Sequence, residues 1–124
     1  MKLTLYPTLN EVLFLHEQLL LRFGGAGGIR DLGLLESALM RPQTGYYDSL
    51  STQAAALLQS LCQNHCFTDG NKRVAFATTA IFLRMNGFSL TVTPDHGETF
   101  MIEEVIKKRA SVEVIAKWLE KHML

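Results

Sequence analysis

Residues 64–73 hold most of the side chains in this sequence that could take part in a reaction. His65 offers an imidazole, and histidine, with an ordinary pKa near ~6.5, can accept a proton at neutral pH. Asp69 offers a carboxylate, which is a hard oxygen ligand for a cation such as Mg2+. The next four residues are candidate donors to an anion: Gly70, Asn71, Lys72 and Arg73. A base, a metal ligand and an anion site in one short segment are the parts of phosphoryl or nucleotidyl transfer.

The anion site follows from where the next helix should start. The apolar pattern predicts a helix from about Asn71 onward, and backbone N–H groups at a helix N-terminus are unpaired and attract anions. The helix dipole disfavours the cations Lys72 and Arg73 at this end, so a bound phosphate gives a reason for their placement. Gly70 lets a ligand approach the backbone closely. Asp69 beside the phosphates fits the preference of Mg2+ for one or two carboxylates together with substrate oxygens.

Other nucleotide-binding signatures are missing from the sequence. No G-x-x-x-x-G-K-[ST] segment is present, which excludes a Walker A loop. The glycines of residues 24–28 follow a helical pattern rather than a strand, so they make a poor dinucleotide fingerprint.

Simpler interpretations of the same residues stay open. His65 could be a core or capping histidine, and Asp69 could do no more than cap the helix after it. Lys72 and Arg73 could lie on a solvated helix face.

The remaining histidines and the two cysteines have their own alternatives. Cys62, His65 and Cys66 could bind zinc, although no fourth ligand stands at zinc-finger spacing. The cysteines are otherwise expected to be small, buried and reduced. The other histidines belong to no cluster and are expected at the surface: His16, His96 and His122.

Composition limits the class of protein. The chain has 124 residues, of which 48% are hydrophobic, and this suits one globular domain spanning residues 1–124. Its 12 Lys and Arg residues balance 12 Asp and Glu residues, so no global field favours direct contact with nucleic acid. No stretch approaches the ~20 apolar residues of a membrane span, and no secretory signal is recognisable. We therefore expect a cytoplasmic protein with neither nucleic acid nor a membrane as a direct partner.

Apolar residues recur at helical spacing along nearly the whole chain, which predicts an all-α fold. We expect a compact bundle of about six helices with at most a short strand or hairpin, the one strand-like segment being residues 88–93. Alanines at 54–56 and in 75–80 predict that the two middle helices pack closely. Capping residues mark the helix starts, and they are Thr8, Asp31, Ser51 or Thr52, Asp95 and Ser111.

Residues 65–73 read H-C-F-T-D-G-N-K-R, and they resemble the signature of the Fic/Doc superfamily in its Doc (death-on-curing) toxin form. The Fic form reads H-P-F-x-D-G-N-G-R-x-x-R, so Lys72 stands at its second glycine and Phe76 at its second arginine. Both departures are typical of the Doc branch. Further similar blocks at residues 23–31, 35–42 and 82–87 extend the resemblance over nearly the whole chain.

This resemblance implies an activity. Doc proteins are all-helical toxins of toxin–antitoxin modules, and their type member is a kinase that transfers the γ-phosphate of ATP to a threonine of the elongation factor that delivers aminoacyl-tRNA. By this likeness His65 is the general base for a Ser/Thr hydroxyl, and Asp69 holds Mg2+. The implied phosphate-binding residues are Gly70, Asn71, Lys72 and Arg73, of which Lys72 and Arg73 also act in catalysis.

The resemblance also leaves alternatives and implies a partner. Fic relatives transfer AMP, but Lys72 fills space where their nucleotide phosphates lie and Phe76 removes a second clamp, which favours the kinase. A catalytically weak toxin that mainly binds its antitoxin is a further alternative. In the family the cognate antitoxin lays a helical C-terminal segment in a groove on the toxin. Residues 43–50 match the place of a flap that docks the target.

Overall fold

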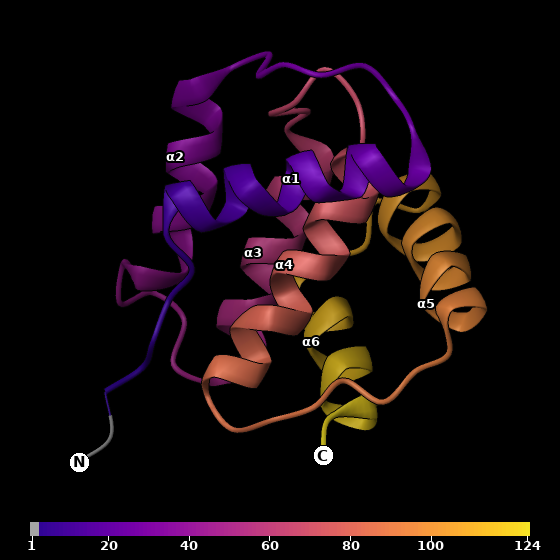
Figure 1. The fold of residues 1–124 in the computed structure, drawn as a ribbon. Helices are drawn as coiled ribbons and strands as arrows, with labels where there is room; N and C mark the ends of the chain where they lie inside the picture. Colours follow the sequence, from indigo (N-terminus) through magenta and orange to yellow (C-terminus); the bar gives the residue numbers. More distant parts are fainter. Residues whose placement is uncertain (1–2) are drawn as a thin grey trace.

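The computed structural model describes residues 3–124, and in this part of the chain loops join helices and there is no sheet. Figure 1 shows α1 lying across α4, with α3 on one side of α4 and α5 on the other, while α6 packs against α3. The six α-helices are α1 (Leu9–Phe23), α2 (Leu32–Met40), α3 (Leu50–Gln63), α4 (Asn71–Met85), α5 (Pro94–Phe100) and α6 (Val112–His122). A 3-10 turn, η1 (Arg41–Gln43), follows α2, and a π-helical segment, η2 (Met101–Lys107), continues α5. The all-α prediction is confirmed.

Short polar side chains start most of these helices, as the sequence predicts. Thr8 and Glu11 form a reciprocal capping box at α1, and Asp31 and Ser111 cap α2 and α6. The third start is two or three residues earlier than expected, because Ser49 rather than Ser51 or Thr52 caps α3 and bonds reciprocally with Thr52.

Two predicted features near the C-terminal third are wrong. Thr93, not Asp95, caps α5, since Pro94 fits the first helical position and brings the start forward. Residues 88–93 form no strand. Only an isolated bridge joins Leu90 to Met123.

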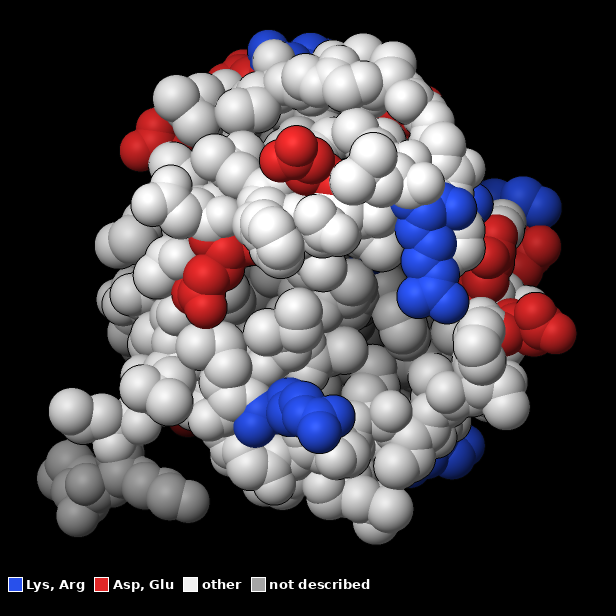
Figure 2. Space-filling view, in the orientation of Figure 1, with Lys and Arg blue, Asp and Glu red and all other residues white. Residues whose placement is uncertain are grey.

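Charged side chains are scattered over the face of the molecule that is seen in Figure 1. Figure 2 shows isolated blue and red groups separated by wide white areas. No helix among residues 3–124 is both long and apolar enough to cross a membrane.

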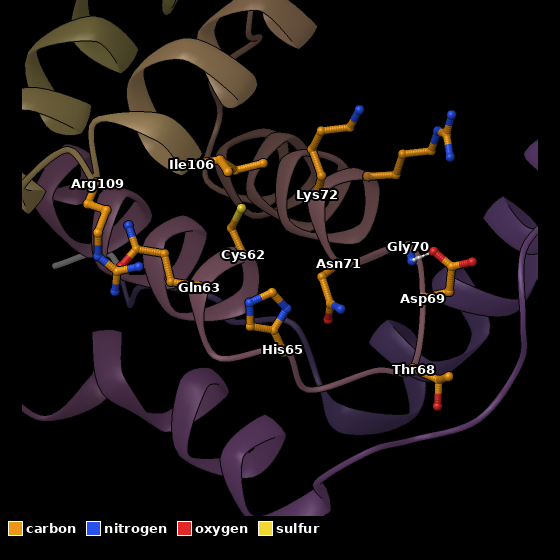
Figure 3. A pocket seen from close by; sticks show the side chains of 11 residues that line it. Cys62, Gln63, His65, Thr68, Asp69, Gly70, Asn71, Lys72, Ile106 and Arg109 are labelled. Carbon is orange, nitrogen blue, oxygen red and sulfur yellow. Dashed lines mark hydrogen bonds between the residues drawn. The ribbon is translucent and has the colours of Figure 1, made fainter.

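The loop of residues 64–70 joins α3 to α4 at one end of the bundle and opens onto a cavity (Figure 3). The α3–α4 pair that flanks it makes the largest helix interface of the described fold, as the alanines predict. Residues at the ends of these two helices are therefore positioned by the largest helix interface of the described fold.

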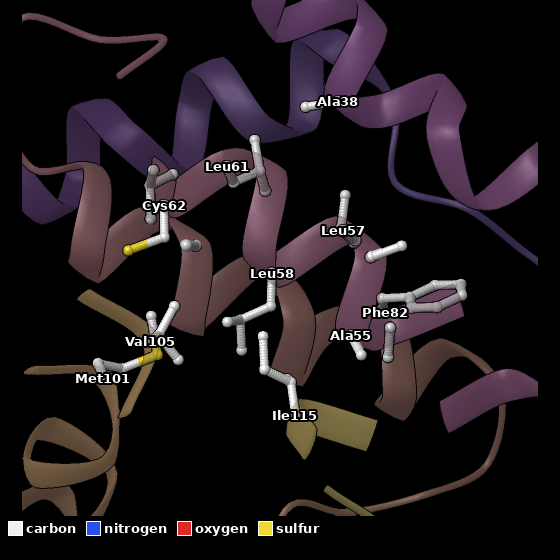
Figure 4. Close-up of a cluster of buried hydrophobic side chains, with 14 of the residues drawn as sticks. Ala38, Ala55, Leu57, Leu58, Leu61, Cys62, Phe82, Met101, Val105 and Ile115 are labelled. Carbon is white, nitrogen blue, oxygen red and sulfur yellow. The ribbon is translucent and has the colours of Figure 1, made fainter. Parts of the chain in front are cut away.

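The core lies around α3, which packs against α2, α4, α6 and η2 (Figure 4). Residues 54–58 of α3 are all fully buried, which small alanines and leucines allow without a gap. The side chains that meet them from other elements include Phe82, Val105 and Ile115. Burying a leucine or phenylalanine side chain stabilises the fold by roughly 1.5–3 kcal/mol.

Candidate active site

A cavity of about 410 Å3 gathers the predicted site residues at the junction of α3 and α4. Its wall includes the six residues singled out in the sequence: His65, Asp69, Gly70, Asn71, Lys72 and Arg73. Figure 3 shows the His65 ring near the middle of this cavity, with Asp69 and Gly70 to one side of it. These six residues from positions 65–73 line the same cavity because the chain turns sharply between α3 and α4.

His65 follows Asn64, the C-cap residue of α3, and has a left-handed backbone, with φ 50°. This conformation is uncommon for a residue with a side chain, and such strain concentrates at functional sites. Arg30 holds the turn from outside. Its Nε donates to the His65 carbonyl oxygen at 2.5 Å, and its Nη2 donates to that of Asn64 at 2.9 Å. The imidazole itself remains solvent-exposed.

Backbone pairing fixes the rest of the loop against the segment before α2. Thr68 donates its N–H to the Gly28 carbonyl at 3.1 Å, while the N–H groups of Arg30 and Asp31 donate to the Cys66 carbonyl at 2.9 and 3.0 Å. These backbone hydrogen bonds join the loop to the segment before α2 and restrict its conformation.

Asp69 is exposed, and two backbone N–H groups hold its carboxylate. Gly70 donates to Oδ1 at 2.8 Å and Ala26 donates to Oδ2 at 3.2 Å. The hydrogen bonds from Ala26 and Gly70 hold the pKa of Asp69 below its usual value. A Cβ at Gly25 would lie 2.8 Å from Oδ2, so only glycine permits this approach. The carboxylate is therefore ionised at neutral pH and still has lone pairs for a cation.

The start of α4 differs from the other α-helices of residues 3–124, because no side chain caps it. Gly70 occupies the N-cap position in the left-handed region, with φ 79°. The backbone N–H groups of the first turn are thus available to an anion. The Asp69 cap considered above does not form, because Asp69 bonds Gly70 and Ala26 instead.

The Asn71 side chain is used within the loop. Its Nδ2 donates to the Phe67 carbonyl at 2.9 Å, and its Oδ1 accepts from the Phe67 N–H at 3.0 Å. The Asn71 amide therefore holds the loop closed, and its backbone N–H is the group of this residue that an anion could bind.

The two predicted cations reach neighbours at the edge of the cavity. Lys72 Nζ forms an ion pair with Glu98 Oε1 of α5 at 2.8 Å, and this contact lowers the pKa of Glu98. The Arg73 guanidinium lies over the Phe23 ring, 4.6 Å from its centroid. Both side chains still belong to the cavity wall.

Comparison with known proteins indicates the family of the chain. A sequence model of the Fic/DOC family matches residues 6–83. The chain is 45% identical over 101 residues to "Toxin Doc" of Mycolicibacterium smegmatis, covering 76% of this chain and 77% of that protein. It is 32% identical over 90 residues to "Protein kinase doc" of Escherichia phage P1, covering 69% of this chain and 71% of that protein.

The chain belongs to the Fic/DOC family. Within it the similarity is to Doc toxins, as the motif predicts. Phe76 stands where Fic members carry their second arginine, and here its ring fits against α5. A Cβ on Gly97 would lie 2.8 Å from the Phe76 Cζ atom. In this family member, α5 thus closes over the position of the second arginine.

Sequence reasoning missed two residues that shape this Fic/DOC site. His16 was expected at the surface but is 5% exposed, because its Nε2 reaches the Asp69 carbonyl at 2.7 Å. Its place four residues after the buried Val12, on one helix face, is the signal that could have indicated burial. Arg109, from the far side of η2, also lines the cavity, and no sequence signal pointed to it.

The alternatives based on sulfur ligands and on a core histidine are wrong. Among residues 3–124 no three His, Cys, Asp or Glu side chains form a group that could hold a metal ion, so Cys62, His65 and Cys66 make no zinc site. Both cysteines are buried and free, as expected. His65 is exposed in the cavity rather than packed in the core.

Proposed function

We propose that the chain is a Doc-type toxin that transfers the γ-phosphate of ATP to a Ser or Thr hydroxyl of a protein. The observation that carries this proposal is that the His65 imidazole shares one cavity with the uncapped N-terminus of α4 and the Asp69 carboxylate. These are a base, an anion site and a cation ligand, which phosphoryl transfer requires together.

In the proposed step the acceptor hydroxyl donates its proton to the His65 imidazole. The hydroxyl oxygen forms a bond to the γ-phosphorus, the bond from that phosphorus to the bridging oxygen breaks, and ADP leaves with the electron pair. The first-turn N–H groups of α4 orient the phosphates, and Lys72 and Arg73 add positive charge nearby. The imidazolium then releases its proton to solvent.

Mg2+ is the cofactor implied by the family, and the donor set fits it. The Asp69 carboxylate is exposed and ionised, and substrate phosphates would complete its shell in the way Mg2+ prefers. When bound, Mg2+ neutralises charge on the phosphate oxygens. No second carboxylate is needed for this role.

Lys72 and Phe76 support phosphate transfer over AMP transfer. Lys72 replaces the small glycine of the Fic motif, and Phe76 packs on Gly97 instead of offering a guanidinium. The relative from phage P1 is named a protein kinase. AMP transfer, as in Fic proteins, is the alternative reaction.

The proposed partners are a translation elongation factor as target and a cognate antitoxin. An apolar groove between α1, α4 and α5 suits a helical antitoxin segment, and its lining includes Leu19, Phe23, Phe76, Val92, Pro94 and Met101. The balance of 12 basic and 12 acidic residues favours no direct contact with nucleic acid, and we place the action in the cytoplasm. A catalytically weak toxin that mainly binds its antitoxin is the competing function.

Labelled ATP tests the reaction directly. Purified protein is incubated with a bacterial lysate and either γ-labelled or α-labelled ATP, and the modified protein and residue are identified by mass spectrometry. We expect γ-label on a Ser or Thr of an elongation factor, and no transfer by His65→Ala. His96→Ala removes an exposed histidine outside the cavity and should behave as the parent.

The outcomes separate the alternatives. Transfer of α-label without γ-label selects AMP transfer. Parental labelling by His65→Ala contradicts the base role, and tight antitoxin binding without any transfer selects the binding module.

A further inference from the structure

Two residues with side chains have a left-handed backbone among residues 3–124, and both line the same cavity. They are His65, with φ 50°, and Arg109, with φ 51°. Each follows the C-cap residue of a helical segment, Asn64 of α3 for His65 and Lys108 of η2 for Arg109, and glycine is the least costly residue at such a position. An arginine at such a position costs folding free energy, and retained strain of this kind marks functional sites.

Two glutamines of α3 fix the chain on either side of Arg109. Gln63 Nε2 donates to the Val105 carbonyl at 3.1 Å, and Gln59 Nε2 donates to the Ala110 carbonyl at 3.0 Å. The Ala110 N–H closes the turn on the Glu104 carbonyl at 2.9 Å. The end of η2 is therefore attached to α3, the helix that leads into the loop with His65. Helical turns of the π type often occur at functional sites.

Arg109 differs from its neighbours in charge pairing. Lys107 and Lys108 form ion pairs with Glu103 and Glu104, at 3.1 and 3.0 Å. Within residues 3–124 the Arg109 guanidinium makes no ion pair with a carboxylate. Because Glu98 partly neutralises Lys72, Arg109 supplies uncompensated positive charge to the His65 end of the cavity.

The position of Arg109 matches the path of the group that is transferred. In Figure 3 the His65 ring lies between Arg109 and the side of the cavity formed by Asp69 and Gly70. If the nucleotide phosphates bind at the start of α4 and the hydroxyl binds at His65, the terminal phosphate lies between them. A phosphate that moves from there toward His65 also moves toward Arg109, whose guanidinium can bind its oxygens through two parallel hydrogen bonds.

We propose that Arg109 is a catalytic residue of the reaction proposed above, and that its guanidinium binds the terminal phosphate of ATP as that phosphate moves toward the hydroxyl at His65. It takes no proton and forms no bond; it stabilises the charge on the phosphate oxygens. It would supply the clamp that the family motif loses where Phe76 replaces the second arginine. This inference rests on the proposed function.

The test uses Arg109→Gly, because glycine fits the left-handed backbone. We expect its melting temperature to equal or exceed that of the parent, while its affinity for ATP and for inorganic tripolyphosphate falls about 10- to 100-fold. AMP affinity should change less than about twofold, since the terminal phosphate is missing. Lys108→Ala makes the same charge change one residue away and should bind like the parent. Arg109→Lys keeps the positive charge but cannot form two parallel hydrogen bonds, so its affinity for ATP and tripolyphosphate should lie between those of the parent and Arg109→Gly.

Binding and transfer are measured on the same samples, which separates this inference from the proposed function. Parental tripolyphosphate binding by Arg109→Gly, or an equal loss in Lys108→Ala, overturns the clamp, as does a parent that binds no tripolyphosphate. If tripolyphosphate binding depends on Arg109 but the parent transfers no label, phosphate binding by Arg109 is supported and the kinase activity is rejected. If the parent transfers label and Arg109→Gly does so at the same rate, the kinase activity is supported and the proposed role of Arg109 is rejected.

Discussion

The imidazole of His16 connects α1 to the carbonyl oxygen of Asp69, with Nε2 and that oxygen 2.7 Å apart. The same ring stacks on Phe67, with centroids 3.8 Å apart and planes inclined by 14°. One side chain thus supports the loop through both a hydrogen bond and a buried aromatic contact. The loop that presents Asp69 and His65 therefore depends on a helix about 50 residues earlier in the chain.

We expect His16→Ala to lower the free energy of unfolding by about 2–4 kcal/mol, because it removes a buried ring and a hydrogen bond. His16→Phe keeps the stacking and should cost about 1 kcal/mol. Urea unfolding measures both. Phe14→Ala, on the same helix and 64% exposed, is the control and should change stability by less than about 0.5 kcal/mol. Equal stability of His16→Ala and the parent would contradict the supporting role.

Gly25 controls the position of the Asp69 carboxylate. Gly25→Ala would place Cβ 2.8 Å from Asp69 Oδ2, so we expect weaker Mg2+-dependent binding of ATP, by about tenfold. The neighbouring Gly24→Ala is the matched control, since it meets nothing within 4 Å and also has positive φ. Both variants should lose stability from backbone strain, about 1–3 kcal/mol each. Calorimetric titration should show the affinity loss in Gly25→Ala alone; a similar loss in Gly24→Ala would assign it to strain.

Arg30 keeps His65 in its strained conformation by binding two carbonyl oxygens at the end of α3. We predict that Arg30→Ala slows phosphate transfer about tenfold with little change in the KM for ATP, because the base is misplaced while the anion site stays intact. Arg30→Lys should recover part of the rate. Steady-state kinetics measure the split between kcat and KM, with Arg84→Ala at the other end of α4 as control. A rise in KM at constant kcat would be the contrary result.

Glu98 forms an ion pair with Lys72 at 2.8 Å, so it would compete with a bound phosphate for the Lys72 ammonium group. Glu98→Gln should strengthen ATP binding about two- to fivefold by releasing the Lys72 ammonium group. Glu113→Gln, on the first turn of α6 and outside the cavity, should leave the affinity unchanged. Weaker binding by Glu98→Gln would mean that Glu98 orients Lys72 for the phosphate rather than withholding it.

The same carboxylate makes a small contribution to stability that depends on pH. Its contact with Lys72 lowers the pKa of Glu98 from the ordinary value of 4.5, so the stabilisation is full above that value and is lost as pH falls through the lower pKa of the folded state. Melting curves of the parent and Glu98→Gln should differ near neutral pH and converge as pH falls through the lowered pKa of Glu98 in the folded state. A constant difference down to pH 2.5 would exclude this origin.

The sequence predicted the parts of this molecule that local interactions decide. The caps at Thr8, Asp31 and Ser111 act within three residues, so spacing alone identifies them. The candidate site residues from His65 to Arg73 form one segment, so their presence in one cavity could be expected.

Tertiary contacts decided what the sequence did not predict. The Asn71 amide turns toward Phe67, and Lys72 finds Glu98 on another helix, and neither partner is legible in the motif. His16 is buried because the loop comes to it, and Arg109 reaches the cavity because Gln63 holds η2 in place. Such residues belong to the site through packing rather than through their place in the chain.

The reactivity of the two cysteines should measure how often the helical bundle opens. Cys62 is 4% exposed, and burial raises the pKa of its thiol to about 11 although Lys72 is near. Burial raises the pKa of the Cys66 thiol as well. Alkylating reagents attack the thiolate, so the folded chain should resist iodoacetamide at neutral pH, and each modified molecule records an excursion in which α3 and its loop separated from the rest.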